Sequence, residues 1–232
     1  MNDLTEEQQV ERLREWWSQY GMLVIIGVVI FCGAFFGTRY WRNAELKHSQ
    51  DASEVYAQAG EAASASELEA LQAGYVTLKA DYADTPYPVQ AGLRLAALYM
   101  QRGEIEEAET VLKEVLTSNQ DDVIEPIIAT RLARVQLYAD RPDDALGTLS
   151  ATEAGNQEPL FNELRGDAHV ARGDADAARA AYEAARDAGT AGPLVDPLVI
   201  EMKLADLARA TAATASPPTT PAQAPAASED AG

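Results

Sequence analysis

The chain has 232 residues, of which 37 are acidic and 18 basic, and its formal net charge is -19. That length allows one or two domains. The acidic balance argues against nucleic-acid binding, because a phosphate-binding surface needs clustered Lys and Arg, and the sequence has no such cluster. The single cysteine, Cys32, excludes an internal disulfide and a two-cysteine metal motif.

The first predicted element is an apolar helix over residues 18–38. From Trp16 to Thr38 there are 23 residues without a charge, which as a helix would span roughly 34 Å against a hydrocarbon core of about 30 Å. A cleavable signal has a basic start, a shorter apolar stretch and an exit of small residues. Here the start holds five acids and two arginines, and the exit reads CGAFFGTRYW. The sequence therefore predicts a retained transmembrane helix over 18–38, after a short acidic tail over 1–17.

Basic residues beside this helix leave its orientation open. Two precede it and three follow it: Arg12, Arg14, Arg39, Arg42 and Lys47. The small excess after the helix favours a cytoplasmic C-terminal part, but large domains cross the membrane largely regardless of charge. Within the helix, Gly33 and Gly37 form a G-x-x-x-G pattern, which lets a second helix approach closely. A surface that simply faces lipid is the alternative interpretation of that pattern.

A juxtamembrane helix is expected over 39–54, and helical periodicity then continues to residue 210. Three stretches in this region align with one another: GLRLAALYMQRGEIEEAETVLKEVL (92–116), RLARVQLYADRPDDALGTLSA (131–151) and NELRGDAHVARGDADAARAAYEAA (162–185). Each predicts an apolar helix, a turn and a second helix that begins among acidic residues. The turns are expected at Gly103, Asp140 and Gly173, and a weaker copy with Gly74 and Leu78 precedes the three.

Small and large residues alternate in the second helix of each copy, where a small residue is followed four positions later by a large one. The pairs are Ala108 with Leu112, Ala145 with Leu149, and Ala178 with Tyr182. Two helices of a hairpin approach closely only where one side chain is tiny, and the larger residue fills the space beside the next hairpin. With Gly166 in the preceding helix, this pattern resembles tetratricopeptide repeats, which are helix pairs of about 34 residues.

These observations predict an all-α fold, with a single N-terminal transmembrane helix followed by a tetratricopeptide-repeat-like α-solenoid over 55–210. Its last helix, within residues 193–210, is expected to cap the array. Residues 211–232 are rich in Ala, Pro and Thr and lack large apolar residues. Such a composition cannot bury a core, so we expect a disordered tail.

No catalytic motif is present in the sequence. It lacks G-x-S-x-G, a phosphate-binding glycine loop and H-E-x-x-H, and its two histidines, His48 and His169, are far apart. The sequence therefore predicts no enzymatic activity and no catalytic, metal-binding or cofactor-binding residues, and it predicts no small-molecule substrate.

A helical array offers a long concave surface for binding protein. The candidate residues on that face are Leu93, Met100, Arg134, Leu137 and Tyr138. Only Arg134 among the inward positions is basic, which argues against an acidic C-terminal peptide and favours an apolar or mixed segment. The alternative is that these residues simply pack against neighbouring helices.

The whole layout resembles the YfgM-like proteins, ancillary subunits of the bacterial SecYEG translocon. The resemblance rests on the order of anchor, RYWRN (39–43) and repeats, and on RLARVQ (131–136), LRGDAHVARGDADAARAAYEAA (164–185) and EMKLADL (201–207). It implies an inner-membrane protein with a cytoplasmic N-terminus and a periplasmic repeat domain. It also implies association with SecYEG and the membrane-anchored chaperone PpiD, transfer of exported client proteins to periplasmic chaperones, and a part in restraining an envelope stress response.

Two other functions fit the same layout. One is a scaffold subunit of another cell-envelope complex, and the other is a cytoplasm-facing adaptor with reversed topology. The tail after Thr211 has no counterpart in the resemblance.

Overall fold

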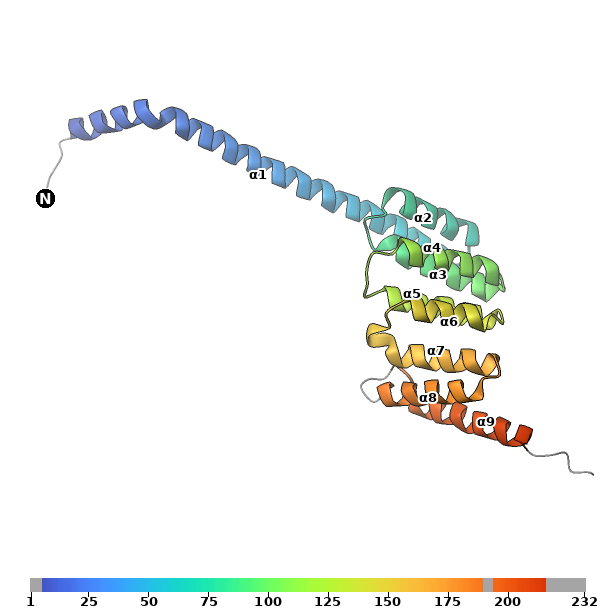
Figure 1. Cartoon of the computed structure of the whole chain (residues 1–232). Helices are drawn as coiled ribbons and strands as arrows, with labels where there is room; N and C mark the ends of the chain where they lie inside the picture. Colours follow the sequence, from blue (N-terminus) through green and yellow to red (C-terminus); the bar gives the residue numbers. More distant parts are fainter. Residues whose placement is uncertain (1–5, 190–193, 216–232) are drawn as a thin grey trace, which may run out of the picture.

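The computed structural model describes residues 6–189 and 194–215, and within them the chain is helical with short turns. The helix α1 (Glu6–Ser64) projects away from the others; its C-terminal end lies beside α2 at one end of the stack of helices (Figure 1). The remaining helices are α2 (Leu68–Asp81), α3 (Tyr87–Arg102), α4 (Ile105–Ser118), α5 (Glu125–Tyr138), α6 (Pro142–Ala151), the 3₁₀ helix η1 (Gly155–Gln157), α7 (Glu158–Ala171), α8 (Ala175–Gly189) and α9 (Pro197–Ala215). The predicted all-α fold is confirmed.

Four helix pairs, α1 with α2, α3 with α4, α5 with α6 and α7 with α8, build the array. Each pair turns on one residue with left-handed backbone: Ser66 (φ 60), Gly103 (φ 78), Asp140 (φ 57) and Gly173 (φ 77). After each of these residues the next backbone N–H donates to the carbonyl five residues earlier, as Glu104 does to Tyr99 and Asp174 to His169. This bond closes the helix end in a Schellman motif. The three expected turns are confirmed, and Ser66 adds a fourth of the same geometry.

The alternation of small and large residues has the expected packing consequence. The side chains of Ala108, Ala145 and Ala178 are fully buried, and each large partner four residues later is buried as well. At Gly166 in α7 an added Cβ would lie only 2.4 Å from the Tyr182 ring of α8, so this glycine lets the two helices approach. The pairs therefore pack at distances that only small side chains allow.

The first helix is continuous where the sequence suggested separate segments. It passes residues 38 and 54 without a break because no proline interrupts it before Ser64. Its stretch Val10–Phe36 contains an 18-residue window with a mean hydropathy of 2.1, and 6% of the residues of that window are buried, so the stretch is long and apolar enough to cross a membrane. Ala52 is already part of the core formed with α2 and α3. The repeat array thus begins inside α1, slightly before the expected boundary at 55.

The last helix also differs from its expected bounds. It starts at Pro197, where proline fits a first helical position, and the Asp196 carboxylate accepts a hydrogen bond from the Leu198 N–H at 2.9 Å. It continues to Ala215, five residues beyond the expected end at 210, because TAATA contains good helix formers and no breaker. Residues 211–215 of the expected disordered tail are therefore helical, and 216–232 lie outside the described residues.

Candidate partner-binding groove

The first helices of the four pairs line a row of cavities along one face of the array. The cavities lie between α1 and α3, between α3 and α5, and between α5 and α7. Neighbouring cavities share residues: Arg94, then Ala97, then Arg134 and Tyr138. They therefore form one continuous groove across α1, α3, α5 and α7, called here the array groove.

The middle of the array groove is a cavity of about 470 Å³ between α3 and α5. It is lined by apolar and basic side chains, which are Leu93, Ala96, Ala97, Met100, Leu112, Arg131, Arg134, Val135 and Tyr138. Tyr138 is 70% exposed. The structure thus brings four of the five candidate residues around one cavity.

The fifth candidate, Leu137, lines the adjoining cavity between α5 and α7 together with Arg134 and Tyr138. Leu93, Met100 and Leu137 are half-buried and also pack against the hydrophobic clusters beneath them. Each of these three side chains therefore packs against the core on one side and lines the groove on the other. Tyr138, in contrast, is largely exposed.

Three arginines lie along the array groove, not one. Arg94 lines its α1 end and Arg131 lines its middle, beside the predicted Arg134. The expectation that Arg134 is the only basic residue on this face is therefore wrong. The RLAR spacing held the missing signal, because residues three apart lie on the same face of a helix. Arg94 was missed because its place depends on how α3 packs against α1.

The three groove arginines lack ion-pair partners. Within residues 6–189 and 194–215, no carboxylate oxygen lies within 4.0 Å of their guanidinium nitrogens. Most other cations of the array are paired, such as Lys79 with Glu114, Arg102 with Glu104 and Arg172 with Asp143. Arg165 of α7, which donates to Asn162 and to the Leu149 carbonyl, and Arg179 of α8 also have no carboxylate partner among the described residues. The middle of the groove, which Arg131 and Arg134 line without an acidic side chain, therefore carries positive charge in a strongly acidic chain.

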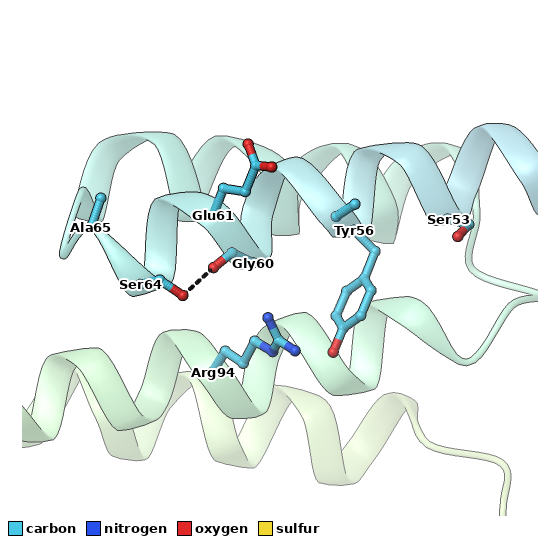
Figure 2. Close-up of a pocket in the computed structure, with 8 residues that line it drawn as sticks. Ser53, Tyr56, Gly60, Glu61, Ser64, Ala65 and Arg94 are labelled. Carbon is cyan, nitrogen blue, oxygen red and sulfur yellow. Dashed lines mark hydrogen bonds between the residues drawn. The ribbon is translucent and has the colours of Figure 1, made fainter.

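At the α1 end, Arg94 reaches from α3 toward α1 in a cavity of about 740 Å³ (Figure 2). Its guanidinium carbon lies 4.7 Å from the centroid of the Tyr56 ring, a cation–π contact. A Cβ at Gly60 would lie 2.4 Å from an Arg94 nitrogen. The absence of a side chain at residue 60 thus makes room for the arginine head.

At the α7 end, acidic side chains are already neutralised by the last helix. The Lys203 ammonium of α9 donates to Glu163 at 2.8 Å and to Asp167 at 2.7 Å, and the Tyr182 hydroxyl donates to Asp167 at 2.7 Å. Burial lowers the pKa of Lys203, but the hydrogen bonds to the two carboxylates outweigh that effect and raise it above its ordinary value. The carboxylates at the α7 end of the groove therefore already have partners within the array.

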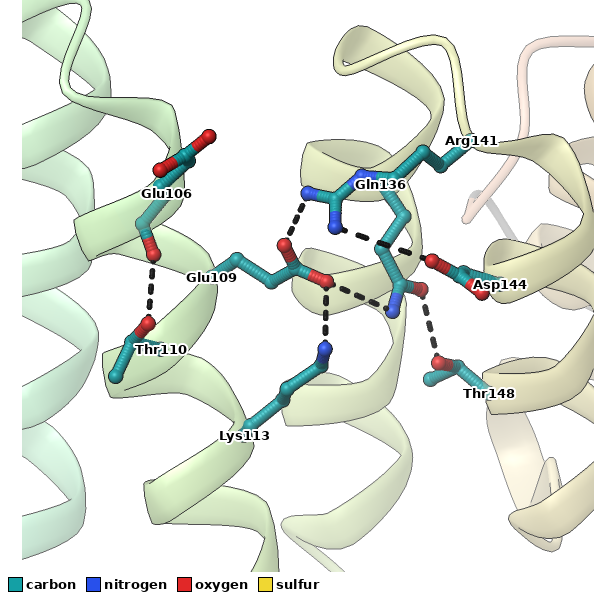
Figure 3. A network of polar contacts seen from close by, with 8 residues as sticks. All are labelled: Glu106, Glu109, Thr110, Lys113, Gln136, Arg141, Asp144 and Thr148. Atoms are coloured by element: carbon teal, nitrogen blue, oxygen red, sulfur yellow. Dashed lines mark hydrogen bonds and ion pairs between the residues drawn. The ribbon is translucent and has the colours of Figure 1, made fainter.

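A polar network on α4 fixes α5 and α6 against the preceding pair (Figure 3). Glu109 is 4% exposed, and its carboxylate accepts hydrogen bonds from Lys113 at 2.9 Å, from Gln136 at 3.4 Å and from Arg141. The Gln136 side-chain carbonyl in turn accepts a hydrogen bond from Thr148 of α6 at 2.8 Å. Because α5 carries Arg131, Arg134 and Tyr138, this network helps to set the width of the groove.

The predicted contact in the membrane helix is only partly described. Gly33 has no heavy atom within 4 Å of an added Cβ, so its surface is open. Gly37 lies in the helical backbone, but its surroundings are outside the described side chains. A helix–helix contact at these glycines stays a prediction.

Comparison with known proteins gives consistent matches over most of the chain. A family model described as a tetratricopeptide repeat-like domain matches residues 14–209. A protein of Haemophilus influenzae named "Ancillary SecYEG translocon subunit" is 30% identical over 168 residues, which cover 72% of this chain and 82% of that protein. A protein of the same name from Escherichia coli is 30% identical over 163 residues, covering 70% and 78%. The crystal structure of PcrH from Pseudomonas aeruginosa superposes with a TM-score of 0.48 at 18% identity, covering 53% of this chain and 94% of that one.

Proposed function

The chain belongs to the tetratricopeptide repeat-like family of ancillary SecYEG translocon subunits, and from this membership we propose that it is a membrane-anchored adaptor beside the translocon. In this proposal α1 crosses the inner membrane once, with the N-terminus in the cytoplasm and the array in the periplasm. The array groove binds partner proteins, which include exported chains and the membrane-anchored chaperone PpiD, and helps to pass exported proteins to periplasmic chaperones.

The observation that carries this proposal is the match to the translocon subunits, which covers 82% of the Haemophilus influenzae protein. The geometry of α1 supports it. The apolar stretch ends at Phe36 and the array core begins at Ala52, sixteen residues later in the same helix, which corresponds to about 24 Å. A continuous helix of that length would hold the groove close to the membrane surface, where a chain leaving the translocon emerges.

A binding role also agrees with the chemistry of the groove. In the described part of the chain, no group of three or more His, Cys, Asp or Glu residues could hold a metal ion. The groove presents arginines, a tyrosine and aliphatic side chains, which recognise a partner through charge and apolar contact. Arrays of this kind act by presenting such surfaces, and the chain is therefore proposed as an adaptor without catalytic activity.

Orientation is tested by protease accessibility of the array. We expect protease added to spheroplasts to digest residues beyond α1, and the same residues to be protected in inverted membrane vesicles. A cytoplasmic protein and a periplasmic protein detected in the same samples control for leakage. The reverse pattern would place the array in the cytoplasm and replace the export function with that of a cytoplasm-facing adaptor.

Association with the translocon is tested by purifying the chain in mild detergent and measuring the SecY recovered with it. If Gly33 lies in a contact with a neighbouring helix, Gly33→Leu should lower recovery about fivefold, because an interhelical contact in a membrane contributes about 1 kcal/mol. Gly27→Leu is the matched control, since Gly27 also has open space around it. Equal recovery from both variants would remove Gly33 from the interface, and absence of SecY from the unmodified chain would remove the proposed function itself.

A further inference from the structure

We propose that the array groove binds an extended peptide segment of a partner protein in which carboxylates flank a large apolar side chain. This inference rests on the proposed adaptor function and adds the chemical class of the partner segment. Its elements are the arginines of α3 and α5, the apolar lining between these helices, and the charges at the two ends of the groove.

The first element is the positive charge in the groove. Arg131 and Arg134 lie one helical turn apart on α5, and both line the cavity beside α3. Neither has a carboxylate partner among the described residues, although acids outnumber basic residues two to one in this chain. The planar guanidinium group can bind a carboxylate through two parallel hydrogen bonds. The pair therefore presents donors whose natural acceptors come from outside the array.

The second element is apolar and lies in the same cavity. Leu93 and Met100 of α3 and Val135 of α5 form part of its lining, and the largely exposed Tyr138 ring stands beside them. Methionine adapts its shape to different ligands, and tyrosine is a rigid anchor that is frequent in protein interfaces. An apolar side chain of the partner would lose contact with water here while its neighbouring carboxylates reach the arginines.

The third element is the shape of the groove, which crosses four helices instead of running along one. Packed helices lie about 8–10 Å apart, and an extended chain advances about 3.3 Å per residue. A segment of roughly eight to ten residues would thus pass α1, α3, α5 and α7. Successive side chains of an extended segment point in opposite directions. This alternation suits a cavity that has charged side chains on one side and apolar side chains on the other.

The fourth element sets where the carboxylates go. Glu61 lines the α1 end of the groove, and Glu163 and Asp167 line the α7 end with their charge already matched by Lys203. Acidic residues of a partner would be repelled by Glu61 at the α1 end, and in the cavity beside α7 the cation that they can reach is Arg134 of α5. The middle of the groove, at Arg131 and Arg134, is the favoured place for them.

The test uses the full chain in detergent micelles and a fluorescently labelled peptide of about ten residues. The peptide consists of Gly and Ser with one Phe between two Asp, and its matched partner has Asn in place of both Asp. Fluorescence anisotropy should show the Asp peptide binding about tenfold more tightly or better, because hydrogen bonds to charged groups contribute that much. The difference should shrink as salt is raised. Equal binding of the two peptides would overturn the proposal.

Variants locate the binding within the groove. Arg131→Gln with Arg134→Gln should lower the affinity for the Asp peptide about tenfold and leave that for the Asn peptide unchanged. The control, Arg179→Gln with Arg209→Gln, removes the same charge from exposed positions on α8 and α9 and should change neither affinity. Circular dichroism checks that both double variants remain helical. An equal loss in the control variant, or displacement of the peptide by single-stranded DNA of equal charge, would reduce the effect to general electrostatic attraction and overturn the proposal.

Recovery of SecY with the same proteins separates the two levels of inference. If the unmodified chain recovers SecY but does not discriminate between the peptides, the ligand class is wrong and the adaptor function stands. If the unmodified chain discriminates between the peptides but recovers no SecY, the groove chemistry is supported and the translocon association fails.

Discussion

Gly166→Ala is expected to lower the free energy of unfolding by about 2 kcal/mol, whereas Gly147→Ala is expected to raise it by up to about 1 kcal/mol. Both glycines lie inside helices, so alanine improves helix propensity at both sites. An added Cβ at 147 meets nothing within 4 Å, but at 166 it would lie 2.4 Å from the Tyr182 ring. The same added methyl group therefore stabilises the fold at residue 147 and destabilises it at residue 166.

Moving the Tyr182 ring aside would cost free energy, because several contacts hold it in place. Its hydroxyl donates to Asp167 at 2.7 Å, and the Lys203 ammonium lies 5.6 Å from the ring centroid. Burial and the carboxylates of Asp167 and Glu163 raise the pKa of Tyr182 well above its ordinary value, so the hydroxyl keeps the proton that it donates. A shift of the ring would break contacts that join α7, α8 and α9. The steric clash in Gly166→Ala is therefore not relieved, and the variant stays destabilised.

Chemical denaturation of the full chain in detergent, followed by circular dichroism, measures both changes. Gly166→Ala combined with Tyr182→Leu should be less destabilised than the sum of the two single changes, because the smaller side chain at residue 182 vacates the space that the methyl group needs. Changes of the same sign at residues 147 and 166, or strict additivity in the double variant, would contradict close packing of α7 on α8.

The sequence predicts features that depend on neighbouring residues. The three turns at Gly103, Asp140 and Gly173 follow from local chemistry, because a residue with positive φ ends one helix and acidic residues start the next. The buried alanines of the second helices follow from their spacing. Such signals lie within one helix pair, and a single copy of the repeat is enough to read them.

Features that depend on the stacking of pairs were missed. Arg94 enters the array groove only because Gly60, 34 residues earlier on α1, leaves room for its head. Glu109 meets Gln136 and Arg141, which are 27 and 32 residues further along the chain. The rotation of one pair against the next determines these contacts, and no local pattern of the sequence encodes it.

This division bears on function. Residues that build a repeat can be read from spacing and are shared by arrays with unrelated partners, whereas residues that define the groove come from different pairs. The stacking of α3 against α1 adds Arg94 to the groove, beside Arg131 and Arg134, which lie three residues apart on α5. The ligand proposed above is accordingly a mixed segment in which carboxylates flank the apolar side chain.

The network at Glu109 decides how the second and third pairs are joined, and its loss should have the largest effect on stability. Glu109→Ala is expected to lower the free energy of unfolding by about 3 kcal/mol, because the buried amide of Gln136 loses an acceptor and two cations lose their partner. Glu106→Ala is the matched control on the same helix. Glu106 is exposed, so its change should stay within about 0.5 kcal/mol.

The pH dependence of stability distinguishes the contribution of the Glu109 charge from that of the packing of its side chain. Burial raises the pKa of Glu109, but the donors Lys113, Arg141 and Gln136 outweigh burial and hold it below its ordinary value. A carboxyl group with a lower pKa in the folded state stabilises the fold above its unfolded pKa, and this contribution is lost as the pH falls through the folded pKa. Glu109→Gln should therefore be less stable than the unmodified chain at pH 7, and the gap should close below about pH 4. A gap that persists in acid would assign the effect of Glu109 to packing and remove the ion pairs as the link between the two helix pairs.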